Sequence, residues 1–426
     1  LYLNGSWASS IRHHNGKFYV AFCTPYGWGT EKGHFSVCEA EKPEGPWRRT
    51  VFPEYLYDPG LLFDDDGKVY VVHGQHKLYV TELNADVRSV KGKPVEIWNK
   101  GVDDSRGSGK KAGMEGSHVY KINGMYYITC PAGGTEGWQV CLRSKNIYGP
   151  YEHKVILQDD SSYPPNGLHQ GGMVQLKNGD WWFVIMQDRG PIGRVPHLLP
   201  VKWVDGWPVL GVNGKDAITY RKPEVGKTYK VKTPATTDEF SGKKLGLQWQ
   251  WNHNPDHTKW SLSESPGHMR LKASQASDLK SARNTLTQRV QGPNSEGTVE
   301  IDLSGLKDGN VAGFGVFGFP YAYVAVQQEG NVRKVVMCND GKIVETAVDN
   351  LTQNKLWIRA RVTDKDFTAR FYYSLDGVDF SPVGDVLKMG LGLPWTANRF
   401  ALFNFTTREA GVDGIADFNW FRFNGK

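Results

Sequence analysis

The sequence predicts an all-β protein in which a β-propeller is followed by a jelly-roll-like β-sandwich. The first observation is compositional: of 426 residues 12% are aromatic, and 49 Gly and 22 Pro supply turns. Together these favour short strands over long helices. The second is a hairpin pattern that recurs four times in the first half of the chain. The third is a change to longer alternating strands in the second half, without helical periodicity.

The composition also excludes several classes of function. A formal net charge of +6 over 426 residues is too dilute for a nucleic-acid-binding surface. The longest apolar runs, such as residues 181–186, fall well short of the ~18–20 residues that a membrane helix needs. Five Cys, an odd number in a long chain, imply no disulfide framework, and no Cys–His spacing suits zinc. We therefore expect no nucleic-acid or membrane partner, no metal site and no required cofactor, with a structural calcium and the oligomeric state left open.

Each recurring segment is a hairpin centred on an Asn-Gly or Asp-Gly pair. The turn glycines are Gly16, Gly67, Gly124 and Gly179, about 50–60 residues apart, which is the period of a propeller repeat. Each pair follows a short alternating run and precedes β-branched and aromatic residues, as expected of a type I′ turn, whose two central residues need positive φ. Further alternating strands fit inside the first and third repeats. Four strands per repeat are typical of propeller blades.

The repeat also aligns a set of residues. Nine positions before the four turn glycines stand Trp7, Asp58, Glu115 and Gln170, the last of them next to His169. These positions open the first strand of each repeat, and in a propeller the first strand of every blade is the innermost one. We therefore expect the two carboxylates to meet at the mouth of one axial funnel, with Trp7 and His169 beside them. The alternative is that both carboxylates are solvated turn residues.

Two carboxylates in an aromatic-lined funnel suit the hydrolysis of glycosides. One carboxylic acid can protonate the departing oxygen while other carboxylates hold charge or activate water. Arg194 could reach the same funnel and fix a hydroxyl group, or it could be an ordinary surface or ion-pair residue. The three consecutive aspartates at 64–66 are expected to be a solvated hairpin turn, because they lack the further spaced oxygen ligands of a calcium loop.

These residues resemble a known family, the family-43 glycoside hydrolases, over most of residues 1–220. The motifs that carry the resemblance are Gly-Ser-Trp-Ala-Ser at 5–9, Tyr-Asp-Pro-Gly-Leu-Leu-Phe-Asp-Asp-Asp-Gly at 57–67, Met-Glu-Gly-Ser-His-Val-Tyr at 114–120, His-Gln-Gly-Gly-Met-Val-Gln at 169–175 and Gly-Arg-Val-Pro-His-Leu-Leu-Pro-Val-Lys-Trp at 193–203. The resemblance implies a five-bladed propeller, of which four blades are visible in this chain. It also implies an inverting β-xylosidase, α-L-arabinofuranosidase or arabinanase.

The resemblance also implies roles for individual residues. Glu115 matches the general acid, and Asp58 matches the second aspartate, which orients that acid and raises its pKa. Trp7, His169 and Arg194 match positions of the substrate pocket. The chain has Ser9 and Ser117 where the family pattern often has Pro, and these are differences within loops.

The third carboxylate of the family, the general base, is an Asp on the first blade. Trp7 already opens what resembles the second blade, so we expect the first blade and the base to lie upstream of Leu1. The propeller domain, residues 1–221, is thus expected to be N-terminally incomplete. Two hypotheses follow. The first is an inverting enzyme that releases terminal α-L-arabinofuranose or β-D-xylose from hemicellulose-type oligo- or polysaccharides, for which a secreted or periplasmic location is expected. The second is a catalytically inactive carbohydrate-binding protein without the base.

The second half of the chain follows a polar segment. Residues 222–237, which contain two Pro and four Lys, are expected to be a linker. Residues 238–426 alternate in the manner of a β-sandwich and resemble the C-terminal sandwich of some family-43 xylosidases and arabinofuranosidases. Trp249, Trp251 and Trp260 could form a platform for sugars or could belong to the core, which is the usual place for buried aromatic residues.

Overall fold

The computed structural model describes residues 5–27, 32–103, 111–216, 219–230, 232–390 and 396–425. Within these ranges the helical elements are three short 3₁₀ helices, η1 Gly134–Glu136, η2 Gly190–Ile192 and η3 Glu409–Gly411. The chain divides into two compact units, one formed mainly by Leu3–Asp188 and Val195–Tyr229, the other by Arg189–Arg194 and Lys230–Lys426. The all-β fold class predicted from the sequence is confirmed.

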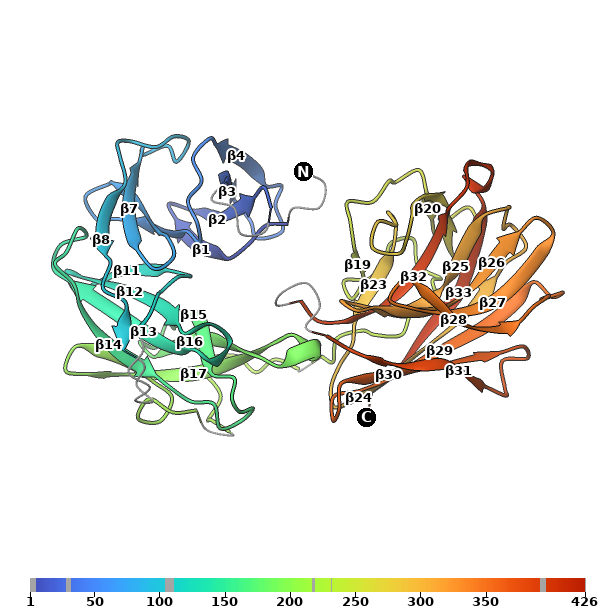
Figure 1. Cartoon of the computed structure of the whole chain (residues 1–426). Coiled ribbons are helices and arrows are strands. Elements are labelled where there is room, and N and C mark those ends of the chain that lie inside the picture. The colour runs from blue at the N-terminus through green and yellow to red at the C-terminus, as the bar shows by residue number, and fades with distance from the viewer. Residues whose placement is uncertain are drawn as a thin grey trace. The chain divides into compact units, whose positions relative to one another are not determined.

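The described part of the first unit contains four sheets of four strands, each paired in sequence order (Figure 1, blue to green). The strands are β1 Ser9–His14, β2 Lys17–Pro25, β3 Gly33–Ala40 and β4 Arg48–Phe52; β5 Gly60–Phe63, β6 Val69–His73, β7 Leu78–Leu83 and β8 Val95–Trp98; β11 His118–Ile122, β12 Met125–Ala132, β13 Trp138–Ser144 and β14 Glu152–Leu157; and β15 Leu168–Gln175, β16 Trp181–Asp188, β17 Arg194–Val204 and β18 Trp207–Leu210. Two short strands, β9 Val102–Asp103 and β10 Lys111–Ala112, pair with each other. The predicted propeller arrangement, with four visible blades, is confirmed.

The hairpin turns of the four blades are of two kinds. Asn15-Gly16 and Asn123-Gly124 have positive φ at both central residues, as type I′ turns require. In the turns at Gly67 and Gly179 only the glycine has positive φ. There the longer loop is a type I-like turn closed by a left-handed glycine, so the expected type I′ geometry is wrong for these two hairpins.

The first strands of successive blades pack side by side. Strand β1 packs on β5, and β5 on β11. The Leu61 N–H donates to the Ser10 hydroxyl at 3.1 Å. A Cβ added at Gly60 would lie 2.3 Å from the Ser117 carbonyl oxygen, so only glycine permits this approach. The inner strands therefore converge, as the repeat register predicts, and they bring the residues at their N-terminal ends together.

Apolar residues between neighbouring blades form the cores of the first unit. One cluster joins the first two blades and includes Phe35, Leu61 and Val71, each 0% exposed. Equivalent clusters lie between the second and third blades and between the third and fourth. Residues that point toward solvent or toward the propeller axis do not belong to these cores.

One charged contact between blades contradicts the sequence analysis. Asp64 is only 5% exposed, and its carboxylate accepts hydrogen bonds from the Lys121 ammonium at 2.6 Å and the Tyr126 phenol at 2.5 Å. Burial acts to raise the pKa of Asp64, but the hydrogen bonds from Lys121 and Tyr126 outweigh it and the pKa is lowered. The expectation of a solvated turn at 64–66 is therefore wrong for Asp64, although it fits Asp65, whose side chain is 83% exposed.

The second unit is a sandwich of two sheets (Figure 1, yellow to red), antiparallel except where β22 pairs with β32 in parallel. The eight-stranded sheet contains β19 Gln250–Trp251, β22 Ser274–Gln275, β23 Leu286–Arg289, β25 Asn310–Phe317, β26 Ala322–Glu329, β27 Val332–Asn339, β28 Lys342–Val348 and β32 Arg399–Thr406. The seven-stranded sheet contains β20 Trp260–Ser261, β21 Met269–Lys272, β24 Asn294–Asp302, β29 Lys355–Thr363, β30 Thr368–Ser374, β31 Ser381–Lys388 and β33 Ile415–Gly425. The predicted sandwich is confirmed.

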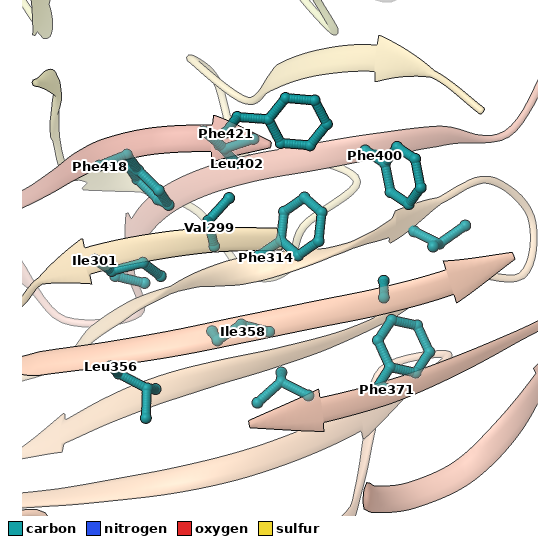
Figure 2. Packing of buried hydrophobic residues seen from close by; sticks show 14 of the residues in the cluster. Val299, Ile301, Phe314, Leu356, Ile358, Phe371, Phe400, Leu402, Phe418 and Phe421 are labelled. Carbon is teal, nitrogen blue, oxygen red and sulfur yellow. The ribbon is translucent and has the colours of Figure 1, made fainter. Parts of the chain in front are cut away.

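The core of the sandwich lies between these two sheets. Figure 2 shows Val299, Ile358 and Phe421 from the seven-stranded sheet packed with Phe314 and Phe400 from the other sheet. All five are 0% exposed. Because alternate residues of each strand point inward, the other half of the seven-stranded sheet's residues form its outer face.

The three tryptophans considered as a sugar platform pack against this core. Trp249 is 7% exposed, its ring lies 5.1 Å from that of Phe421, and its indole N–H donates to Asp238 at 2.8 Å. Trp251 and Trp260 are half-buried, with ring centroids 5.2 Å apart. Trp249 is therefore a core residue, in agreement with the second alternative.

The two units meet in sequence within a segment poor in regular structure. Between β18 and β19 the described residues form only isolated bridges, Val212 with Lys215 and Asp238 with Phe421. The division between Tyr229 and Lys230 falls inside the polar segment 222–237.

Candidate active site

Asp58 lies at the N-terminal end of the inner strand of the second blade, two residues before β5. Its side chain is buried, and Oδ2 accepts a hydrogen bond from the Gly116 N–H at 3.1 Å. The backbone of Asp58 is left-handed, with φ +48°, a conformation that Asp tolerates better than most residues. The Asp58 backbone N–H is a hydrogen-bond donor to the Cys23 thiol, and burial raises the pKa of Cys23 to about 11. Asp58 is thus held by its backbone and by the next blade.

Glu115 occupies the equivalent place on the third blade and is half-buried. Its Oε2 atom accepts two hydrogen bonds, one from the Gln75 amide at 2.7 Å and one from the Tyr57 phenol at 3.2 Å. Among the described residues no side chain or backbone group donates to Oε1. One carboxylate oxygen is therefore fixed by the protein, and the other is left to interact with a ligand.

Tyr57 connects the two carboxylates to the aromatic wall of the site. Burial, followed by the negative charges of Asp58 and Glu115, raises the pKa of Tyr57 far above its ordinary value. The phenol therefore stays protonated at any working pH and remains a donor to Glu115. The Tyr57 ring contacts the Trp7 ring edge to face, with centroids 6.1 Å apart, and the Tyr55 ring at 6.3 Å. The backbone N–H of Trp7 donates to the Cys23 carbonyl at 2.9 Å.

His169 and Gln170 stand at the matching position of the fourth blade. His169 is 4% exposed; its Nδ1 donates to the Gly167 carbonyl at 3.0 Å, and its Nε2 lies 3.5 Å from Asp188. Gln170 sits at a bulge in β15 with φ +57°. A Cβ added at Gly116 would lie 3.2 Å from the Gln170 amide nitrogen, so Gln170 reaches the residue that follows Glu115.

The structure therefore brings together three of the five residues selected from the sequence. Trp7, Asp58 and Glu115 are linked directly through Tyr57 and Gly116. His169 adjoins the cluster through its neighbour Gln170. Arg194 begins β17 but is grouped with the second unit, where its carbonyl accepts a hydrogen bond from Arg289 at 2.9 Å, so its role in the pocket stays a prediction.

The sequence analysis missed two residues that hold Glu115. Tyr57 stands directly before Asp58, so its nearness to the site could have been inferred from the same repeat register. Gln75 lies in the connection between β6 and β7, where neither its residue type nor its spacing marked it. Across the described ranges, no group of three or more His, Cys, Asp or Glu is placed to hold a metal ion, and no helix is long and apolar enough to span a bilayer.

Comparisons with known proteins agree with this fold. Residues 2–208 match the family described as glycosyl hydrolases family 43, and residues 237–424 match the β-xylosidase C-terminal concanavalin A-like domain. A β-xylosidase of Formosa agariphila is 31% identical over 99% of this chain and 78% of its own length. A non-reducing end α-L-arabinofuranosidase of Bacteroides ovatus is 35% identical over 63% of this chain and 52% of its own length.

Solved structures show the same two-part architecture. A protein described as a bifunctional GH43-CE of Bacteroides eggerthii superimposes with a TM-score of 0.87 at 36% identity, over 100% of this chain and 55% of that chain. The GH43 protein BlXynB of Bacillus licheniformis gives a TM-score of 0.83 at 26% identity, over 99% of this chain and 86% of that chain. The propeller, its axial carboxylates and these relatives together define a glycosidase. The chain belongs to family 43 of the glycosyl hydrolases, which confirms the resemblance found in the sequence.

Proposed function

We propose that this glycosidase releases a terminal pentose, β-D-xylose or α-L-arabinofuranose, from xylan-type oligo- and polysaccharides with inversion at the anomeric carbon. The names of the relatives support the pentose class. The observation that carries the chemistry is the one-sided binding of the Glu115 carboxylate. Its Oε2 atom is held by Gln75 and Tyr57, so the proton of the acid belongs on Oε1.

In the proposed reaction Glu115 is the general acid. Its proton passes from Oε1 to the glycosidic oxygen as the bond between that oxygen and the anomeric carbon breaks. Water attacks the anomeric carbon from the opposite face and loses a proton to a base. Asp58, whose Oδ2 is bonded to the Gly116 N–H, orients the backbone that carries Glu115. No described residue is assigned the role of the base, and the reaction uses no cofactor.

The acid assignment is tested with Glu115→Gln and substrates of different leaving-group quality. Loss of general acid catalysis typically lowers the rate by about 10²–10⁴-fold, and we expect this loss on xylooligosaccharides, whose leaving alkoxide needs a proton. A nitrophenyl pentoside needs none and should lose far less. Glu44→Gln, an exposed glutamate in the same unit, is the matched control and should behave as the parent. Equal losses on both substrates would contradict the acid role.

Azide separates the proposed enzyme from the alternative, a carbohydrate-binding protein without turnover. Azide attacks the anomeric carbon without giving up a proton, so it replaces water where no base acts. If the site binds the pentoside in a position open to attack at the anomeric carbon, azide should restore or accelerate cleavage of nitrophenyl pentosides and give a glycosyl azide of inverted configuration. Binding of the sugar without cleavage, with or without azide, would favour the alternative. Comparing kcat/KM for the xyloside and the arabinofuranoside then identifies the pentose.

A further inference from the structure

The outer face of the seven-stranded sheet carries a hollow whose lining residues all belong to the second unit. It has a volume of about 420 Å³, within the range of small-ligand sites. Its lining residues are Asn294, Ser295, Glu296, Arg361, Val362, Thr363, Thr368, Arg370 and Asn424. They come from four neighbouring strands, β33, β24, β29 and β30.

Strand register aligns the polar side chains of this hollow in one row. Asn424 is opposite Glu296, Glu296 is opposite Arg361, and Arg361 is opposite Arg370. Residues directly opposite in antiparallel strands point to the same face of the sheet. With strands ~4.8 Å apart, the row spans roughly 14 Å. It is an extended line of hydrogen-bonding groups long enough for more than one sugar ring.

Charge in the row is unbalanced. Glu296 pairs with both Arg361 at 2.6 Å and Arg359 at 3.6 Å. Arg370 is exposed and makes no hydrogen bond or ion pair with any described residue. The acids of the β29–β30 turn, Asp364 and Asp366, are not among the lining residues. One guanidinium group of the hollow is therefore available for an anion.

The remaining groups suit a hydroxyl-rich ligand. The amides of Asn294 and Asn424 make no side-chain hydrogen bonds within the described ranges, and each can both donate and accept. The Arg361 guanidinium lies over the Tyr372 ring, 5.0 Å from its centroid, which fixes one side of the hollow. A small inorganic anion would occupy Arg370 and leave these amides unused.

We propose that this hollow binds an acidic saccharide, with a uronate carboxylate on Arg370 and sugar hydroxyls on Asn294 and Asn424. Arginine is suited to this role because its planar fork can bind a carboxylate through two parallel hydrogen bonds. The proposal rests on the proposed function in one respect, namely that the saccharide has a xylan-type backbone. It places on the sandwich a site for chains that carry uronic acid groups, and the hydrolytic step does not use it.

The test is calorimetric titration of the whole chain in a Glu115→Gln background, so that the ligand is not cleaved. The ligands are xylotriose bearing one glucuronic acid group, plain xylotriose and inorganic phosphate. We expect the acidic trisaccharide to bind best and Arg370→Gln to weaken it about tenfold or more, the scale of a charge-assisted bidentate contact. Arg370→Lys keeps the charge but loses the fork, and should recover only part of the affinity.

The matched control is Lys342→Gln on β28, an exposed cation of the other sheet, which should leave binding unchanged. Three results would overturn the proposal: equal affinity for acidic and plain xylotriose, equal weakening by Lys342→Gln, or phosphate binding that depends on Arg370 as strongly as the trisaccharide does. None of them bears on cleavage of nitrophenyl pentosides, so failure of this site and failure of the proposed function are distinguishable.

Discussion

Removing the Tyr57 hydroxyl is the most direct test of how the protein holds its acid. Tyr57→Phe deletes the donor to Glu115 Oε2 and keeps the ring that contacts Trp7 and Tyr55. A hydrogen bond to a charged group is worth about 1.5–3 kcal/mol, which corresponds to about 10- to 150-fold in rate if it is lost in the transition state. Gln75 makes the shorter bond, 2.7 Å against 3.2 Å, but it is exposed, so water can replace its amide. We expect Tyr57→Phe to lower the rate more than Gln75→Ala does, and Gln75→Ala to lower it about tenfold.

The substrate dependence of this loss distinguishes positioning from simple damage. The Tyr57 phenol holds Glu115 through its Oε2 atom, so removing the hydroxyl displaces the acid. A substrate whose leaving group needs a proton should therefore lose more rate than a nitrophenyl pentoside, whose leaving group needs none.

The assay measures kcat and KM on xylooligosaccharides and on nitrophenyl pentosides. Tyr148→Phe, which removes the hydroxyl of an exposed tyrosine on the same unit, is the control for loss of a phenol. We expect the defect to reside mainly in kcat and to be larger for the oligosaccharide. Equal losses on both substrates would refute the idea that Tyr57 acts through Glu115.

Two further predictions concern the joints between blades. Asp64→Asn should lower the free energy of unfolding by about 3 kcal/mol, because it breaks a buried pair by removing one partner. Since the folded pKa of Asp64 is lowered, the deficit should be complete above pH ~4 and disappear as the pH falls through the folded value; denaturant titrations against Asp65→Asn would show it. Gly60→Ala places a Cβ 2.3 Å from the Ser117 carbonyl and should cost about 1–3 kcal/mol and part of the activity. Gly5→Ala, with open space around it, is its control, and equal Tm values for the two would contradict the close packing of the inner strands.

The positions of the two carboxylates could be predicted from sequence because they depend on register alone. Each hairpin turn fixes how far back along the inner strand a residue lies, and the blades repeat this spacing. Asp58 and Glu115 therefore come together without any knowledge of side-chain packing. Arg194 has no fixed spacing from a hairpin turn, so its motif did not predict where its side chain lies or which residues it contacts.

The misjudged residues depend on partners that lie far away in the chain. Asp64 reads as a solvated aspartate in a turn, and only the neighbouring blade shows that Lys121 neutralises it. Gln75 lies in an unremarkable connection, and it matters because the next blade places Glu115 within reach of its amide. Both contacts cross between blades, and the sequence of a single blade contains no signal for them.

Strand register arranges the residues of both sites. In the propeller it stacks one position from each successive blade around a common axis, so residues about 50 positions apart form one cluster. In the sandwich it lines up Asn424, Glu296, Arg361 and Arg370 across four strands. In the sandwich the inward-facing residues of the same strands build the core, so substitutions in this polar row should change ligand binding without loss of the fold.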